Sequence, residues 1–279
     1  MRIADALTAA RQLGVDRLDA QLLIAHALQR PRTWLLAHDD ELLTDVQAAL
    51  LHAQFRQRAD GVPCPYLLGE VAFRGLMLTV NPDVLVPRPE TEVLVEWALQ
   101  CATTAPQASV IDLGTGSGAI ALALKQALPA LAVSASDASP AALAVAQGNG
   151  LKLGLSVDWR TGDWWSPWQR QRFGLAVSNP PYVAGGDAHL AALAHEPLAA
   201  LTPDGDGPGD GLSALLHIID VAPAHLLPGA WLLLEHGHDQ AEALRLALTR
   251  RGFADVQTRP DLAGLPRCTG GRWCDPAGT

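Results

Sequence analysis

The stretch Val110-Ile-Asp-Leu-Gly-Thr-Gly-Ser-Gly-Ala119 joins a short run of strand-forming residues to a glycine-rich loop and the start of an apolar helix. Its glycines permit a tight turn and let the backbone approach a ligand closely. The helix is predicted over residues 119–128, and a second strand over residues 131–136 leads into Asp137. A carboxylate at the tip of that strand can accept both hydroxyls of a ribose. Strand, loop, helix and acid together therefore predict a cofactor that contains a ribose.

The glycine loop by itself leaves two other interpretations open. With Ala119 it also matches the G-x-G-x-x-A form of the dinucleotide fingerprint, so NAD is a competing cofactor. A glycine turn can also serve only to let a helix pack against a strand. We favour cofactor binding because the loop occurs together with the strand, the helix and the acid.

A second motif, Asn179-Pro-Pro-Tyr182, follows a strand predicted over residues 175–178. Ligands bind at the carboxyl ends of parallel strands, and two consecutive prolines stiffen the loop. The side-chain oxygen of Asn179 and the carbonyl of Pro180 can accept both hydrogens of a planar NH2 group. Such a nitrogen is a poor nucleophile because its lone pair is delocalised, and acceptors on both N–H bonds aim that lone pair at an electrophile. Tyr182 can pack on the flat substrate.

The electrophile that suits this loop best is the sulfonium methyl of S-adenosylmethionine, which transfers in line without a metal. In isolation an Asn-Pro-Pro-Tyr sequence is often an ordinary turn. Its pairing with the glycine loop and Asp137 in one sheet favours S-adenosylmethionine over NAD.

Strands and helices alternate from Thr91 onward, which predicts a mostly parallel sheet with helices on both faces. Helices are expected over residues 92–100 and from Pro140, with Ser139 as the N-cap, and a further strand over residues 231–234. We therefore assign residues 91–279 to one α/β domain.

The first 60 residues are predicted to be entirely helical. Helical spacing of apolar residues is seen at Leu18, Leu22, Ala25 and Leu28. Thr44 and Gln47 form a capping box for a helix that passes through Ala53. This part carries no cluster of catalytic residue types, so we assign residues 1–60 to a helical bundle that serves packing and substrate recognition.

Residues 61–90 are predicted to be a linker, since five prolines exclude a long helix. Within it, residues 71–73 and 77–80 flank Arg74-Gly75 and indicate a short β-hairpin.

Composition narrows the classes of function. The chain has 279 residues, 49% of them hydrophobic and 18% charged, so it can bury a sizeable core. Its formal net charge of −9 argues against non-specific nucleic-acid binding. The four cysteines form no C-x2-C pair, so we expect reduced thiols and no metal. No apolar run approaches the ~20 residues of a membrane span, and the N-terminus lacks a cleavage signal, so we expect a cytoplasmic protein.

Taken together, these segments resemble the peptide chain release factor glutamine methyltransferases (PrmC, or HemK). The segments that carry the resemblance are residues 17–23, 86–92, 112–118, 162–164, 179–182 and 234–237. The resemblance implies a small N-terminal helical bundle followed by a class I, Rossmann-like methyltransferase domain. It also implies N5-methylation of the glutamine in the Gly-Gly-Gln motif of class 1 release factors. We expect a monomer that binds no DNA directly.

The resemblance also assigns roles to residues. Asp137 would hold the ribose of S-adenosylmethionine, Trp164 would lie by the adenine, and Asn179 would contact the cofactor and bind the substrate amide. The methionine part of the cofactor would be wrapped by Gly114, Thr115, Gly116, Ser117 and Gly118. The substrate pocket would be completed by Pro180, Pro181 and Tyr182, with Asn179, Pro180 and Tyr182 as the catalytic residues. The segment that closes near the cofactor would include Arg88, Glu90 and Thr91.

Several neighbouring residues have simpler interpretations. At least one of Trp164, Trp165 and Trp168 is expected to serve packing alone, and Asp163 to cap the following turn. Asp204, Asp206 and Asp210 suggest calcium, but an EF-hand count from Asp204 places Leu215 where a bidentate glutamate belongs, so we expect a solvated loop. Glu235 is expected to be a solvated strand-end acid.

Three other functions remain as alternatives. A glutamine methyltransferase of a ribosomal protein would use the same chemistry. An adenine-N6 DNA methyltransferase would act on an exocyclic amine, but it must flip its base and hold a duplex. A non-catalytic module would only sense the cofactor.

Overall fold

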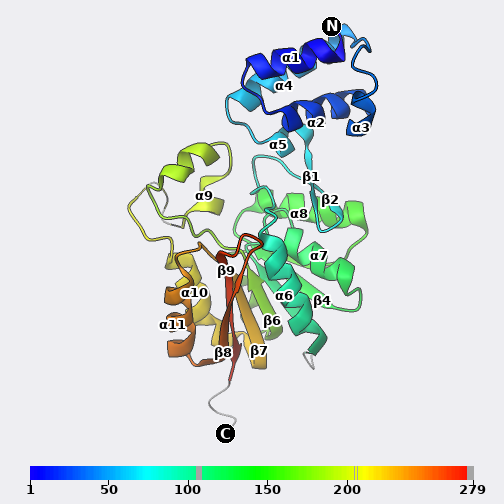
Figure 1. The fold of residues 1–279 in the computed structure, drawn as a ribbon. Helices are drawn as coiled ribbons and strands as arrows, with labels where there is room; N and C mark the ends of the chain where they lie inside the picture. The colour runs from blue at the N-terminus through cyan, green and yellow to red at the C-terminus, as the bar shows by residue number, and fades with distance from the viewer. Residues whose placement is uncertain (105–108, 204, 206, 275–279) are drawn as a thin grey trace. The chain divides into compact units, whose positions relative to one another are not determined.

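The computed structural model describes residues 1–104, 109–203, 205 and 207–274. Asp204 and Asp206, two of the aspartates considered for calcium, lie outside the described residues. The chain divides into two compact units, one of Met1–Glu70 with Ala192–His195, the other of Val71–Ala191 with Glu196–Thr279 (Figure 1). No helix in the described ranges combines the length and apolar character that a membrane span requires.

The first unit is helical, with its core formed between short helices. The helices are α1 (Ile3–Gln12), α2 (Arg17–Leu28), α3 (Arg32–Leu35), α4 (Asp45–Ala59) and α5 (Cys64–Leu68). The predicted capping box is present, since Thr44 accepts a hydrogen bond from the N–H of Gln47 and Gln47 accepts from that of Thr44. The helix predicted around Leu18 is α2, although its fully buried residues are Leu23 and Ile24 and Leu18 itself is exposed.

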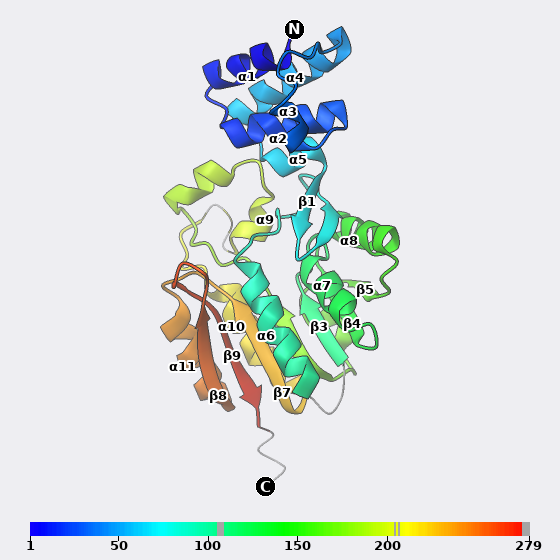
Figure 2. The ribbon, with the colours of Figure 1, turned by 45° about the vertical axis from the view of Figure 1, so that its right-hand side comes forward.

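The predicted hairpin consists of β1 (Glu70–Phe73) and β2 (Leu76–Thr79). Its turn has positive φ at both Arg74 and Gly75, as a tight two-residue hairpin turn requires. Buried Leu78 belongs to the core of the second unit, and the Asn149 side chain hydrogen-bonds both the N–H and the carbonyl of Thr79. Figure 2 shows this hairpin beside α8 (Pro140–Leu153).

The second unit is built on a seven-stranded sheet of order β5-β4-β3-β6-β7-β9-β8, as far as the structure describes the chain. The strands are β3 (Ser109–Leu113), β4 (Ala132–Asp137), β5 (Asp158–Thr161), β6 (Phe173–Ser178), β7 (Leu226–Glu235), β8 (Phe253–Pro260) and β9 (Pro266–Trp273). The neighbouring strands β5, β4, β3, β6 and β7 are parallel to one another. Strand β9 runs antiparallel to both of its neighbours, β7 and β8. The sequence analysis predicted neither β8 nor β9. β8 follows α11, but β9 follows β8 with no helix between them and so departs from the β–α alternation that identifies the other strands.

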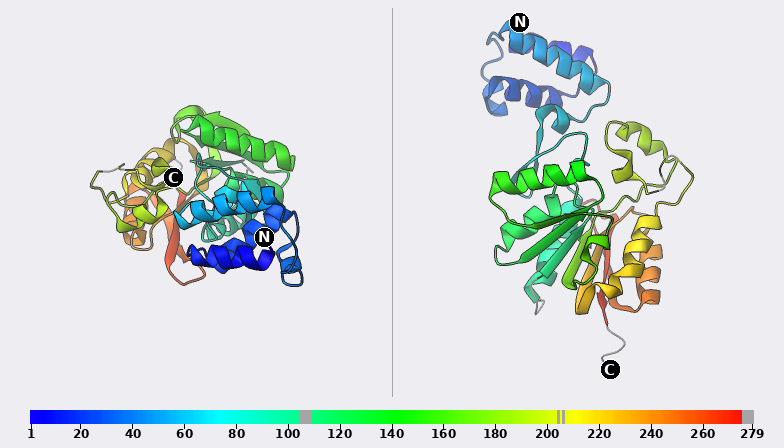
Figure 3. Two further views of the ribbon diagram at one scale, coloured as in Figure 1. Left: turned by 90° about the horizontal axis from the view of Figure 1, so that it is seen from above. Right: turned by 180° about the vertical axis from the view of Figure 1, so that it is seen from behind.

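Helices cover both faces of this sheet (Figure 3). Alternate residues of one strand belong to different cores: Val110 packs with α6 (Thr91–Thr104) and α7 (Ala119–Ala127), and Ile111 packs with α10 (Ser213–Val221) and α11 (Ala241–Arg251). Short turns of helix lie at η1 (Ser166–Trp168), η2 (Ala188–Leu193), α9 (Leu198–Leu201) and η3 (Ala222–Ala224). The prediction of a mostly parallel sheet covered on both faces is confirmed.

The strand order reverses between β3 and β6. From β3 the chain moves outward to β4 and β5, and it then returns to place β6 on the other side of β3. The helices that follow β3 and β6 leave in different directions at this point, which opens a crevice at the carboxyl ends of the two strands.

Candidate functional site

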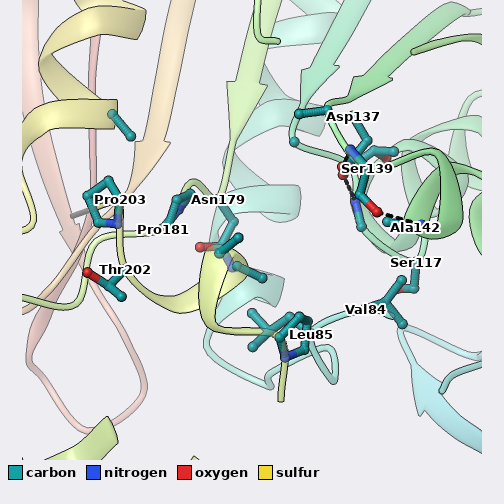
Figure 4. A pocket seen from close by; sticks show the side chains of 18 of the residues that line it. Val84, Leu85, Ser117, Asp137, Ser139, Ala142, Asn179, Pro181, Thr202 and Pro203 are labelled. Carbon is teal, nitrogen blue, oxygen red and sulfur yellow. Dashed lines mark hydrogen bonds between the residues drawn. The ribbon is translucent and has the colours of Figure 1, made fainter. Parts of the chain in front are cut away.

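A cavity of about 890 Å³ lies at this crevice. Its walls come from the glycine loop, the start of α8 and residues 83–91, together with residues after β6 and the first residues of α10. Figure 4 shows Asp137 and Ser139 on one side of it, and Asn179, Pro181 and Thr202 on the other. The volume lies within the range of roughly 300–1,000 Å³ typical of small-molecule sites.

Asp112 fixes the glycine loop from beneath. Its Oδ2 accepts hydrogen bonds from the Thr115 hydroxyl at 2.6 Å and from the N–H of Ala121 at 3.2 Å. The carboxyl is fully buried, and this burial raises its pKa to about 7. Asp112 thereby ties the loop to the first turn of α7.

Gly114 occupies a position that excludes a side chain. Its φ is +71°, and a Cβ added there would meet the ring of Trp164 at 3.0 Å. The N–H groups of Gly114 and Thr115 both donate to the Ser136 carbonyl, so the loop lies across the end of β4. The close approach leaves the indole of Trp164 as part of the cavity wall.

Asp137 is held by two backbone hydrogen bonds. Its Oδ2 accepts from the N–H of Gly116 at 2.8 Å, and its Oδ1 accepts from the N–H of Ser139 at 2.9 Å. Burial raises its pKa, and these two bonds oppose that rise. Each carboxylate oxygen can accept a second hydrogen bond, so the group remains able to bind two hydroxyls from the cavity side.

The tryptophans near the site fall into two groups, as expected: one that lines the cavity and one that serves packing. Trp164 lines the cavity, with a φ of +42°, and its carbonyl accepts a hydrogen bond from Ser136 Oγ. Trp165 and Trp168 are buried in the core of the second unit. The turn after Asp163 is closed by the Asp163 backbone carbonyl, which accepts from the N–H of Ser166, and Asp163 itself lines the cavity.

Asn179 stands at the end of β6 on the opposite wall. It is half-buried, and its Nδ2 donates to Thr91 Oγ1 at 3.2 Å. Thr91 also lines the cavity, as does Pro181. The loop that carries Asn179 is anchored, because the N–H groups of Tyr182 and Val183 both donate to the Leu201 carbonyl.

The structure brings most of the predicted site residues together. Those that line the cavity are Gly114, Thr115, Gly116, Ser117, Asp137, Trp164, Asn179 and Pro181, with Arg88 and Thr91 from the segment before α6. The lining does not include Gly118, Pro180, Tyr182 or Glu90. Tyr182 packs against the core beneath α10 and donates its hydroxyl to Glu235 Oε1 at 3.3 Å.

The expectation that Glu235 is solvated is wrong. Its side chain is 1% exposed, because β9 pairs with β7 as far as Glu235 opposite Cys268 and covers the strand end. Burial raises the Glu235 pKa to about 7, while Thr91, Arg267 and Tyr182 favour the charged form. The antiparallel pair that hides this carboxylate is the part of the sheet that the sequence did not predict.

Sequence reasoning also missed Glu196. Its buried carboxylate accepts a hydrogen bond from the N–H of Val86 at 3.0 Å and forms an ion pair with Arg88. It therefore joins residues 83–91 to residues 197–203, two segments that line the cavity. No motif marks Glu196, since its partners lie more than 100 residues away in the sequence.

Among the residues that the structure describes, no group of three or more potential ligands is arranged to hold a metal ion. The site therefore offers backbone N–H groups, the Asp137 carboxylate and the Asn179 carboxamide around a cavity whose lining also includes Asp83, Asp163, Arg88 and His217.

Two family profiles match the chain. The one described as "Methyltransferase small domain" matches residues 90–206, and the one described as "PrmC N-terminal domain" matches residues 2–69. Similar curated proteins carry the name "Release factor glutamine methyltransferase". The protein from Bordetella pertussis is 47% identical over 261 residues, which span 92% of this chain and 95% of that protein. The one from Xylella fastidiosa strain Temecula1 is 45% identical over 270 residues, spanning 96% and 97%.

Solved structures share the fold at low sequence identity. The hMettl16 catalytic domain, solved with the MAT2A 3'UTR hairpin 6, superposes with a TM-score of 0.55 at 16% identity and covers 84% of each chain. The 16S rRNA N2 G1207 methyltransferase of Thermus thermophilus, solved with AdoMet and guanosine, gives a TM-score of 0.53 at 19% identity and covers 73% of this chain and 49% of its own.

Proposed function

Because the chain belongs to the family of release factor glutamine methyltransferases, we propose that it methylates the side-chain nitrogen (N5) of the glutamine in the Gly-Gly-Gln motif of class 1 release factors. The observation that carries the proposal is the position of Asn179 in one cavity with the glycine loop and Asp137. A carboxamide acceptor opposite a nucleotide-binding loop suits a reaction in which an amide nitrogen attacks a cofactor-borne group.

The cofactor is S-adenosylmethionine, and the residues present fit it. Asp137 retains lone pairs for the two ribose hydroxyls, and Gly114 leaves the indole of Trp164 free to face an adenine. When bound, S-adenosylmethionine supplies an electrophilic sulfonium methyl group. Residues 114–118 would hold its methionine part, since this loop carries backbone N–H groups at the mouth of α7.

Asn179 and Pro180 would prepare the glutamine nitrogen. Nδ2 of Asn179 is taken by Thr91, so its Oδ1 is the atom left to accept an N–H of the substrate amide. The Pro180 carbonyl would accept the second N–H. Two such acceptors would fix the amide and favour localisation of its nitrogen lone pair toward the cofactor. Pro181 contributes an apolar wall there, and Tyr182 supports the loop from behind.

A methyl-transfer assay with labelled cofactor tests the proposed reaction. We expect one added methylene on the Gly-Gly-Gln peptide of a class 1 release factor, and no transfer when that glutamine is replaced by alanine. A ribosomal protein and duplex DNA serve as further substrates in the same assay. Transfer to either of these but not to the release factor would contradict the proposal, as would cofactor binding without transfer to any substrate.

We further propose that the helical unit recognises the protein substrate. The match of residues 2–69 to a domain found in this family supports this role. The small cavity in the second unit, by contrast, accommodates a cofactor and one side chain. A pull-down of release factor by the full chain, compared with a chain whose exposed Leu36, Leu42 and Val46 are changed to serine, tests it. Equal capture by both proteins would contradict this role for those three side chains.

A further inference from the structure

The buried side chain of Gln240 lies directly before α11, where the chain turns after β7. It is 8% exposed, and both of its polar atoms are hydrogen-bonded to backbone groups. Its Oε1 accepts from the N–H of Gly237 at 2.9 Å, and its Nε2 donates to the carbonyls of Tyr182 at 2.9 Å and Asp210 at 3.1 Å. One carboxamide therefore joins the chain after β7 to two segments that are 58 and 30 residues away in the sequence.

The hydrogen-bond partners leave the Gln240 carboxamide a single orientation. A backbone N–H only donates and a carbonyl oxygen only accepts, so the carboxamide oxygen has to face Gly237 and the NH2 group has to face the two carbonyls. The NH2 group has two N–H bonds, and each carbonyl takes one of them. Exchanging the two ends of the carboxamide would place donor against donor and acceptor against acceptor at all three contacts.

The Tyr182 carbonyl that Gln240 binds is also in close contact with Gly211. A Cβ added to Gly211 would lie 2.1 Å from this oxygen, and the φ of Gly211 is +71°, so both the space and the backbone conformation require glycine there. On its other side, the N–H groups of Tyr182 and Val183 donate to the Leu201 carbonyl. The backbone at Tyr182 is thus fixed by three segments of the second unit.

Tyr182 belongs to the loop that carries the proposed acceptors of the substrate amide. Asn179 precedes it by three residues, and Pro180 and Pro181 lie between them. Each proline fixes its own φ, so the loop is stiff, and a displacement at Tyr182 is transmitted to the Pro180 carbonyl and to Asn179. A misplacement of about 1 Å at a reacting group can lower a rate about 100-fold.

The second carbonyl, that of Asp210, leads into another part of the cavity wall. Helix α10 begins three residues later, and the residues of this helix that line the cavity are Ser213, Ala214 and His217. Helices α10 and α11 lie side by side and share one core of the second unit (Figure 1). By binding both carbonyls, Gln240 fixes the distance between the loop that carries Asn179 and the start of α10.

We propose that Gln240 is a positioning residue for methyl transfer, which acts by fixing the loop of residues 179–182 relative to α10. Gln240 does not line the cavity, so it acts through the backbone of Tyr182. The inference rests on the proposed function, because the groups that it positions are the acceptors of the substrate amide. All three hydrogen bonds of Gln240 lie outside residues 112–139, which hold Asp137, so the affinity for S-adenosylmethionine should not depend on it.

The first test compares Gln240→Met and Gln240→Glu with the wild type at saturating S-adenosylmethionine. Methionine has nearly the same length as glutamine but donates no hydrogen bond, whereas glutamate keeps the acceptor for Gly237 and places an oxygen against the two carbonyls. We expect kcat on the release factor to fall about 10- to 100-fold in Gln240→Met, and at least as far in Gln240→Glu. The Kd for S-adenosylmethionine, measured by calorimetry, is expected to stay within about twofold, since the cofactor wall is a separate site.

The matched control is Leu248→Ala, which truncates a fully buried residue of the same helix. Leu248 lies roughly 12 Å further along α11. Its truncation lowers the free energy of unfolding, measured by urea denaturation, but leaves the Tyr182 and Asp210 hydrogen bonds in place. We expect the kcat of this control to stay within about twofold of the wild type. Gln240 variants that are destabilised like the control but keep wild-type kcat would overturn the proposal, as would a Kd that rises as much as kcat falls.

Gly211→Ala displaces the same carbonyl without altering Gln240, and it keeps the proposal testable if a Gln240 variant does not fold. The added methyl group would collide with the Tyr182 oxygen, so we expect kcat to fall about 10- to 100-fold with cofactor affinity retained. Because both changes displace one loop, Gln240→Met should add little further loss in the Gly211→Ala background. Wild-type kcat in Gly211→Ala, or losses that multiply in the double variant, would contradict a shared action through Tyr182.

The wild-type enzyme, assayed alongside on the release factor, reports on the proposed function by itself. Its failure to transfer would reject that function, and this inference with it. Transfer by the wild type together with unchanged kcat in the Gln240 and Gly211 variants would reject only the positioning role.

Discussion

The two walls of the cavity are built in different ways. The wall that carries Asp137 is held by hydrogen bonds within residues 112–139, and most of these involve backbone N–H groups. The wall that carries Asn179 depends on side chains of Thr91, Tyr182, Glu235 and Glu196, which come from segments far apart in the chain. The proposed cofactor site is thus encoded locally, whereas the proposed substrate site depends on tertiary structure.

This difference explains what could be predicted from the sequence. Glycines that require positive φ and an acid at the next strand end have short, recognisable spacing, so Gly114 and Asp137 were identified without a structure. The same holds for the Ser139 cap of α8, which accepts from the N–H of Ala142 as predicted.

The sequence failed where a contact depends on the C-terminal antiparallel strands. Glu235 looks like a solvated strand-end acid until β9 is known to cover it. Glu196 carries no local signal at all, because its carboxylate finds its partners only when residues 83–91 fold beside it. The side chains behind Asn179 belong to motifs that the sequence reveals, but the sequence does not show which of them hydrogen-bond to one another.

The largest effect is expected from breaking the locally encoded wall, which carries Asp137. The quantity affected is the affinity for the cofactor. Asp137→Ala removes the acceptors for the ribose hydroxyls and leaves the N–H groups of Gly116 and Ser139 without their partner. Hydrogen bonds to charged groups contribute about 1.5–3 kcal/mol each, so we expect the Kd for S-adenosylmethionine to rise about 100-fold. Calorimetric titration measures it, with Asp137→Asn as the variant that keeps one acceptor oxygen.

At saturating cofactor, Asp137→Ala is expected to keep most of its kcat, since Asn179 and its partners are untouched. A variant that binds S-adenosylmethionine as tightly as the wild type would show that Asp137 does not hold the ribose.

Breaking the wall that carries Asn179, which depends on tertiary contacts, is expected to have an effect of intermediate size. Glu196→Ala leaves the N–H of Val86 unpaired and removes the ion pair with Arg88. We expect a loss of about 1–3 kcal/mol in the free energy of unfolding, measured by urea denaturation. The matched control is Glu96→Ala, which breaks the more exposed ion pair with Arg74 and should change stability by less than about 1 kcal/mol. Equal losses in the two variants would contradict a special role of Glu196.

The smallest expected effect is a pH dependence of the free energy of unfolding, which arises in the wall that carries Asp137. The folded pKa of Asp112 is raised to about 7, so its protonated form is favoured by folding. Its contribution to stability is therefore complete below about pH 4, near its unfolded pKa, and is lost as the pH rises toward 7. Asp112→Asn cannot titrate. Relative to this variant, the wild type should lose about 1 kcal/mol between pH 6 and pH 7.

Urea denaturation of both proteins at the two pH values measures this difference. A wild type whose stability changes in parallel with that of Asp112→Asn would show that Asp112 keeps an ordinary pKa in the folded protein.

The most direct measurement of the central claim is the single-turnover rate of Asn179→Ala on a release factor at saturating S-adenosylmethionine, with the Kd for the cofactor determined on the same sample. If Asn179 serves the substrate amide while the opposite wall serves the cofactor, the rate falls by about 10³ and the Kd stays within about twofold. A rate like that of the wild type, or a loss of cofactor affinity as large as the loss of rate, would contradict the account.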